Sequence, residues 1–344
     1  MKKRSNTDIK PWRYDTIQGI SAFLAVVFCF TILVQLQLVC AEDAKESKFE
    51  SSEKVSEDGN VLEGHSFHGE AFNEGPRQKA YLMGGTANVT FEVSTEDALA
   101  QQFFNQGIGQ LHGFWYFEAE RSFRQVAMLD PECAMAYWGM AMANFENEKR
   151  AIGFIKEAVK RKENVSKREQ LWIDGGDEYL KSKKKDAKTA KQEYIRDLEE
   201  IIHEHPDDIE AKAFLVVRLY QFKGDLPIAS HQAVDAILDQ VFALNPMHPA
   251  HHYRIHLWDR EKPERALESA ARGGQSGPSI AHLWHMPGHI YSRLKRYSDA
   301  VWQQEASSRA DHAHMMRDRV MPDQIHNYAH NQEWMTRNLI NIGR

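Results

Sequence analysis

Apolar and polar residues follow a helical period through most of the chain. From Ser94 onward, segments in which apolar side chains recur every three or four residues follow one another with short polar breaks. Such spacing places the apolar residues on one face of a helix. Ser94, with Asp97 three residues later, suits the start of the first helix. Later helices are expected over 166–180, 192–204, 209–222 and 325–342. The expected fold class is therefore all-α.

Side-chain sizes in these helices also recur at a near-constant interval. With Ala100 as position 1, an aromatic ring stands at position 4, glycine at 8, alanine at 20, an aromatic ring at 24 and proline at 32. These residues are Phe103, Gly107, Ala119, Phe123 and Pro131. Further units begin at Ala134, His248 and Ala281. The pattern resembles the tetratricopeptide (TPR) repeat, in which small residues let two antiparallel helices approach closely and bulky ones fill the space between them.

Three longer segments are similar to extracytoplasmic bacterial TPR proteins: Gly109–Arg124, Ala136–Gly139 and His285–His289. This resemblance implies a right-handed α-solenoid of antiparallel helix pairs over residues 93–344. It also implies that the concave groove of the solenoid holds a protein or peptide partner, or a small polar ligand. It brings no settled activity with it, so we expect a binding or scaffold protein rather than an enzyme.

Local features modify this repeat. Pro287 stands where the TPR pattern usually has leucine, and because proline lacks an N–H we expect its helix to kink or to start late. The glycine-rich stretch 273–278 predicts a turn between helices. No second helix follows 325–342. We therefore expect a truncated chain or, alternatively, another chain that covers the apolar face of this last helix.

The N-terminus has the features of an export signal. A basic opening, Met1–Arg4, precedes an apolar run over 19–34, and compact residues stand before Glu42. This order is typical of a cleaved signal peptide, and the alternative is an uncleaved membrane anchor. Residues 1–41 are therefore assigned to a signal peptide or anchor. We expect an exported, periplasmic or extracytoplasmic protein that meets a membrane only through residues 19–41, if these are not cleaved.

Residues 42–92 are expected to form a flexible linker, because most of them are polar or small and lack hydrophobic periodicity. Within this linker, Asn88–Val93 alternates like a short extended strand and is expected to lie against the first helix. His65 and His68 fit a loop better than a metal site, because no second pair of ligands lies nearby.

Charge, cysteine content and the absence of common motifs exclude several classes. The formal net charge is -6, and without clustered cations we expect no nucleic-acid partner. The lysine run 181–191 lacks interleaved aromatic residues and fits a solvated helix face. The three cysteines, Cys29, Cys40 and Cys133, are too few for a disulfide framework after signal removal. A phosphate-binding glycine loop, a Gly-x-Ser-x-Gly elbow and a Cys-x-x-Cys motif are missing.

Histidine placement is the strongest chemical signal. The chain has 17 histidines. Three pairs are spaced four residues apart: His252 with His256, His285 with His289, and His326 with His330. That spacing puts both rings of a pair on one face of one helix. Each pair lies on the first helix of a successive repeat, and the TPR resemblance implies that these helices line the groove.

Two rings one helical turn apart can bind one transition-metal ion, and a third ligand from the next helix would complete a site with an open position. The expected cofactor of such a site is a divalent Zn, Cu, Fe or Ni ion. Asp311, His312, His314 and Glu333 are candidate extra ligands. Two alternatives stay open: the histidines satisfy hydrogen bonds in tight helix interfaces, or they bind an anionic partner when protonated. No residue is assigned a catalytic role.

Overall fold

All regular secondary structure that the computed structural model describes, over residues 78–344, is helical. This confirms the all-α prediction. Three short 3-10 turns, η2 to η4, interrupt the series at Lys162–Asn164, Pro263–Ala266 and Pro322–Gln324. The α-helices are α2 (Ala98–His112), α3 (Tyr116–Leu129), α4 (Ala134–Ala143), α5 (Glu148–Arg161), α6 (Lys167–Ser182), α7 (Ala187–Glu204), α8 (Ile209–Gln221), α9 (His231–Leu244), α10 (His251–Trp258), α11 (Leu267–Ser276), α12 (Ala281–Arg293), α13 (Tyr297–Asp318) and α14 (His326–Asn341).

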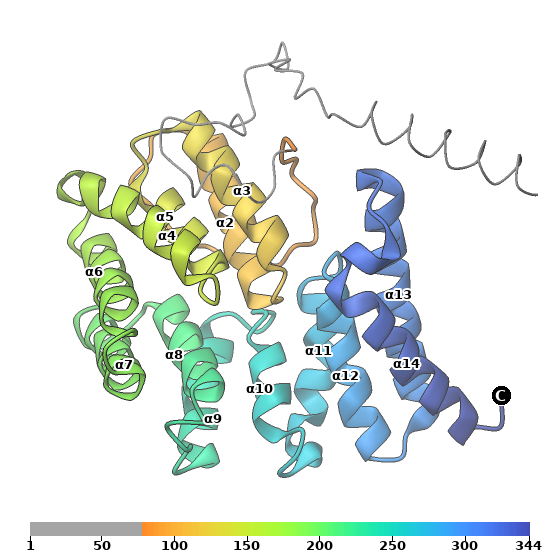
Figure 1. Cartoon of the computed structure of the whole chain (residues 1–344). Coiled ribbons are helices and arrows are strands. Elements are labelled where there is room, and N and C mark those ends of the chain that lie inside the picture. The colour runs from red at the N-terminus through yellow and green to blue at the C-terminus, as the bar shows by residue number, and fades with distance from the viewer. Residues whose placement is uncertain (1–77) are drawn as a thin grey trace, which may run out of the picture. The chain divides into compact units, whose positions relative to one another are not determined.

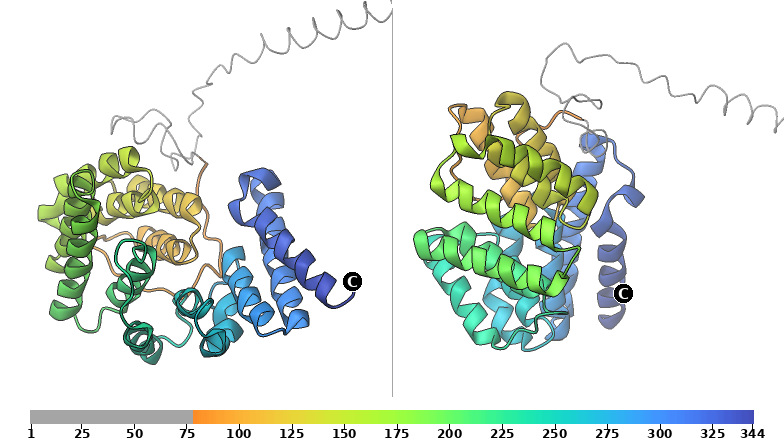
Figure 2. Two further views of the ribbon diagram at one scale, coloured as in Figure 1. Left: turned by 60° about the horizontal axis from the view of Figure 1, so that its bottom comes forward. Right: turned by 60° about the vertical axis from the view of Figure 1, so that its left-hand side comes forward.

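Helices that follow one another in sequence also pack side by side (Figure 1). The pairs are α2 with α3, α4 with α5, α6 with α7, α8 with α9, α10 with α11, and α12 with α13. The helix expected over 325–342 is present as α14, which lies against α13 in both views of Figure 2. Within residues 78–344, no helix is both long and apolar enough to cross a membrane. The expected signal segment, residues 1–41, and the linker residues 42–77, with His65 and His68, lie outside the described range.

The first helix begins later than the sequence predicts. Asp97, rather than Ser94, is its N-cap, because the Asp97 carboxylate accepts hydrogen bonds from the backbone N–H groups of Leu99 and Ala100. The Ser94 N–H is instead bonded to Glu169 at the start of α6, at 2.7 Å. At the start of α6, Ser166 and Glu169 form a capping box.

Replacing Asp97 with alanine is expected to lower the unfolding free energy by about 1 kcal/mol, because two N–H groups of α2 lose their acceptor. Urea unfolding followed by circular dichroism measures this loss. Glu96→Ala is the matched control, since Glu96 is exposed and caps nothing. Equal losses for the two variants would contradict the assignment of Asp97 as the cap.

One bulky ring fills the space between the first two helix pairs. Phe123 of α3 is fully buried, and it lies between Gly107 of α2 and Gly139 of α4. A Cβ atom added at either glycine would lie 2.6 Å from the Phe123 ring. Glycine is therefore required for this close approach, in agreement with the large and small positions of the repeat pattern.

The stretch 273–278 is mostly helical, so the predicted turn is wrong for its first residues. Gly273 and Gly274 lie inside α11 because α12 packs directly on them: a Cβ at Gly274 would lie 2.0 Å from the Trp284 ring. The predicted late start of the next helix is also wrong, since α12 begins at Ala281 and continues through Pro287. The Pro287 ring fits there because it faces Gly273, where a Cβ would lie 3.1 Å from its Cγ.

The segment predicted to be extended, Asn88–Val93, lies against α2 as expected, but it pairs with no strand within the described range. Side chains of α2 make the hydrogen bonds that a partner strand would otherwise make. Gln101 donates to the Phe91 carbonyl at 2.8 Å and accepts from the Val93 N–H at 3.0 Å, and Asn105 accepts from the Phe91 N–H at 3.1 Å. The Phe91 side chain is fully buried. Residues 78–92 therefore belong to the packed part of the chain.

Candidate metal centres

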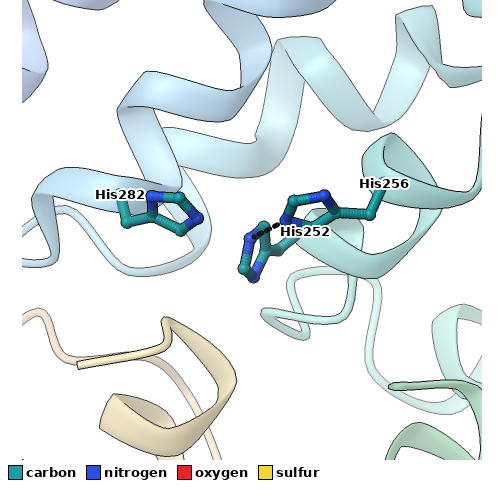
Figure 3. A group of neighbouring side chains, drawn as sticks. All are labelled: His252, His256 and His282. Atoms are coloured by element: carbon teal, nitrogen blue, oxygen red, sulfur yellow. Dashed lines mark hydrogen bonds between the residues drawn. The ribbon is translucent and has the colours of Figure 1, made fainter. Parts of the chain in front are cut away.

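Histidines of α10, α12 and α14 meet in two clusters of three. We name each after the aromatic ring that it packs against. The Phe114 cluster contains His252, His256 and His282 (Figure 3). The Trp334 cluster contains His285, His289 and His330. In both clusters, one nitrogen of each ring lies within 4.8 Å of the corresponding nitrogens of the other two.

The Phe114 cluster begins with a histidine whose tautomer is fixed. Nδ1 of His252 lies 2.8 Å from the backbone carbonyl of His112. A carbonyl only accepts, so this Nδ1 carries the proton and Nε2 keeps its lone pair. Nε2 of His256, one turn later on α10, lies 2.9 Å from Nε2 of His252, as the dashed line in Figure 3 marks. The Nε2 atoms of the two rings therefore face the same small space between them.

The third ring of this cluster comes from the next repeat. His282 faces the α10 pair from α12 (Figure 3). Its Nδ1 lies 3.1 Å from the side-chain oxygen of Asn327, which leaves Nε2 as the acceptor atom. This Nε2 is buried and has no hydrogen-bond partner among the described residues. An unsatisfied buried polar atom costs about 1–3 kcal/mol, so a native structure is expected to give this nitrogen a binding partner.

Phe114 covers the cluster with its ring. The centroid of this ring lies 4.5 Å from that of His252, 5.6 Å from His256 and 5.8 Å from His282. The backbone of Phe114 has φ 57°, in the left-handed region that bulky residues rarely adopt. Such strain persists where the surrounding structure imposes it, and it is concentrated at functional sites. The result is an apolar, shielded environment in which His252 is 1% exposed.

The Trp334 cluster repeats the same arrangement one unit later. Nδ1 of His285 lies 2.8 Å from Oε1 of Gln304 and 2.9 Å from Oδ1 of Asn331. Its Nε2 therefore keeps the lone pair, and Nε2 of His289 lies 2.9 Å from it. The ring of His289 stacks on Trp334 with centroids 4.0 Å apart.

Carboxylates flank the Trp334 cluster. Asp259 lies 3.7 Å from Nδ1 of His289 and is itself bonded to Arg293 at 2.6 Å. Glu333 lies 3.9 Å from Nδ1 of His330. The side chain of His330 is 51% exposed, so this cluster is open to solvent on its α14 side.

Burial keeps most of these rings neutral. Loss of hydration lowers the pKa of His252 to about 4 and that of His285 to about 3, and it holds the pKa of His256 and His282 well below the ordinary value. Metal ions bind the neutral imidazole, so these rings need not release a proton to solution before they coordinate an ion at pH 7.

A third group, His112, Glu210 and His248, is fully buried and internally satisfied. The Glu210 carboxylate accepts from Nε2 of His112 at 2.7 Å and of His248 at 3.0 Å. The other nitrogen of His112 is bonded to the Tyr253 hydroxyl at 2.6 Å, and that of His248 accepts from the Ala250 N–H at 3.0 Å. Every ring nitrogen is used. This group therefore joins α2, α8 and α10 by hydrogen bonds, as the packing alternative describes.

The predicted site residues are thus divided between two clusters rather than gathered in one. The pair His252 and His256 meets His282, which the sequence reasoning missed although it lies one turn before His285 on the same helix. The pair His285 and His289 meets His330. The side chain of His326 lies outside the described residues.

The candidate extra ligands are separate from both clusters, apart from Glu333. Asp311 is buried, and burial raises its pKa to about 7. His312 is exposed on α13. His314 pairs with Asp318 at 3.0 Å and packs against Trp115.

Comparisons of the chain with protein-family models and with curated proteins find no match. No residue role is therefore carried over from a relative, and the chemistry of the clusters follows from their own atoms. Three imidazoles suit Zn²⁺, copper, nickel and iron ions. Three protein ligands also leave a coordination position open for water or a substrate.

Proposed function

We propose that this chain binds transition-metal ions, one at the Phe114 cluster and one at the Trp334 cluster. The observation that carries the proposal is the recurrence of one geometry in two successive repeats. In each, the first histidine gives Nδ1 to a protein oxygen, its Nε2 lies 2.9 Å from Nε2 of the second, and a third ring comes from the following repeat.

The distances suit a shared ion after a small adjustment. Two nitrogens 2.9 Å apart, each about 2.0–2.1 Å from an ion, subtend an angle of about 90° at that ion, and a separation larger by about 0.4 Å gives the tetrahedral angle. The second histidine of each pair must then move its proton from Nε2 to Nδ1. At His289, the Asp259 carboxylate lies beside Nδ1 and is placed to accept a hydrogen bond from the N–H formed there.

Elemental analysis and thermal unfolding of the full chain test the proposal. Dialysis of chelator-treated protein against Zn²⁺, Cu²⁺, Ni²⁺ or Fe²⁺ is expected to leave at least one bound ion per chain for at least one metal. Free ion at about 100 times its Kd should stabilise the fold by about 2.7 kcal/mol at each site. Absence of stoichiometric metal, with no change in Tm for any of the four ions, would refute metal binding.

We also propose that the helix pairs form the TPR-like solenoid that the sequence resembles. Two observations support this. Counted from His248 and from Ala281, the pairs His252/His256 and His285/His289 both fall at positions 5 and 9 of their units. The Phe123 ring is also inserted between small residues, as the repeat requires.

A binding scaffold is the second candidate, and a cavity of about 630 Å³ favours it. Residues 90–94, the start of α6 and residues 204–210 line this cavity, and its walls carry six carboxylates against one arginine and one histidine. A basic peptide segment would complement this charge. Fluorescence anisotropy with lysine-rich and glutamate-rich peptides of equal length tests the idea. Equal or absent binding of the two would count against it.

A further inference from the structure

The two clusters differ in the charge of the groups next to the outward nitrogens of their histidines. At the Trp334 cluster, Asp259 and Glu333 lie 3.7 and 3.9 Å from the outward nitrogens of two of the three rings. Each carboxylate is also paired with an arginine, Arg293 or Arg337, which offsets part of its charge and fixes its position. Carboxylates placed behind histidine ligands strengthen the binding of a cation.

The Phe114 cluster lacks such carboxylates among residues 78–344. Nδ1 of His252 faces the His112 carbonyl and Nδ1 of His282 faces the Asn327 amide, and none of the three histidines is ion-paired with a carboxylate of these residues. Phe114 and Tyr220 add apolar cover, with the Tyr220 ring 4.9 Å from that of His256.

The free energy needed to move an ion from water into an apolar site rises with the square of its charge, so a divalent ion costs roughly four times as much as a monovalent one. Neutral ligands and neutral outer groups leave that cost uncompensated at the Phe114 cluster. Among the ions that imidazole binds well, copper is the one with a stable monovalent state. An apolar, shielded site with three neutral nitrogen donors is therefore better suited to Cu(I) than to a divalent ion.

We infer that the two clusters bind ions of different charge, Cu(I) at the Phe114 cluster and a divalent ion such as Zn²⁺ at the Trp334 cluster. This inference rests on the proposed function, because it assumes that both clusters bind metal. It explains why two sites with the same inner geometry have different outer groups.

The test loads the metal-free full chain with Cu(I) and Zn²⁺ together, under nitrogen with ascorbate, and measures both metals after gel filtration. The unmodified chain is expected to hold one of each. His282→Gln should lower Cu(I) affinity at least about 10-fold and leave Zn²⁺ bound, whereas His330→Gln should do the reverse. X-ray absorption of the bound copper should show a monovalent ion with nitrogen ligands only.

A charge variant gives a second, milder measurement. Asp259→Asn keeps the size of the side chain and removes its charge, so it should weaken Zn²⁺ binding about 10-fold without changing Cu(I) binding. Asp299→Asn is the matched control, because Asp299 is 48% exposed and pairs only with Arg296 of its own segment.

The outcomes are separable. If each ion fills both clusters equally, or if His282→Gln releases Zn²⁺ and keeps Cu(I), the assignment of charge is overturned while metal binding stands. An unchanged Zn²⁺ affinity in Asp259→Asn would also overturn it. If the unmodified chain retains neither ion, this assignment is overturned, and the proposed function fails as well if none of Zn²⁺, Cu²⁺, Ni²⁺ and Fe²⁺ binds in the dialysis experiment.

Discussion

Acidification from about pH 7 to about pH 4 is expected to lower the unfolding free energy of the metal-free protein by several kcal/mol. Burial lowers the pKa of His251 and His252 to about 4 and that of His285 to about 3. In the unfolded chain these rings take up protons below about pH 6.5, whereas in the folded chain they stay neutral until the pH reaches the lowered values. The unfolded state therefore binds more protons in this window and becomes more favourable as the pH falls. Each ring contributes about 3 kcal/mol by pH 4.

Urea unfolding with a chelator present, repeated at several pH values between 7 and 4, measures this effect. His251→Gln should make the dependence less steep, since His251 lies outside both clusters and is bonded to Ser269 and the Pro246 carbonyl. His312→Gln is the control and should keep the original slope, because His312 is exposed. An unfolding free energy that does not change with pH would show that these rings are not held neutral by burial.

Replacing Glu210 with glutamine is expected to lower the unfolding free energy by about 3–5 kcal/mol at neutral pH. The two carboxylate oxygens of Glu210 accept one hydrogen bond each, from His112 and His248, in a site where all three side chains are at most 1% exposed. A glutamine amide has one acceptor oxygen, so its NH₂ group would face a ring N–H and leave that donor unsatisfied. Because this group joins α2, α8 and α10, little relaxation is available.

Chemical denaturation at pH 7 measures the loss for Glu210→Gln. Glu204→Gln makes the same chemical change at an exposed position at the end of α7 and should alter stability by less than about 0.5 kcal/mol. If Glu210→Gln were as mild as this control, the buried network would not be a principal link between the three helices.

Local pattern was sufficient to predict the all-α class and most of the helices, but it missed α9 and the first turn of α7. Caps, apolar spacing and the recurrence of Gly107 and Phe123 depend on neighbours within one or two helical turns, or on a repeat that the sequence displays directly. The pairing of His252 with His256, and of His285 with His289, was predictable for the same reason, since rings four residues apart on one helix share a face. The error at the first helix arose because Ser94 and Asp97 are both good caps, and only the contact of Ser94 with Glu169 decides between them.

The sequence by itself thus determined an all-α chain of paired helices with histidine pairs on successive first helices. The tertiary structure alone decided which rings meet, because the third member of each cluster depends on how one helix is rotated against the next. It brought His282 rather than another pair to His252 and His256, and it placed the carbonyl of His112 behind them. It also set carboxylates beside one cluster and neutral groups beside the other. These contacts join residues far apart in the chain, so the local periodicity of the sequence does not predict them.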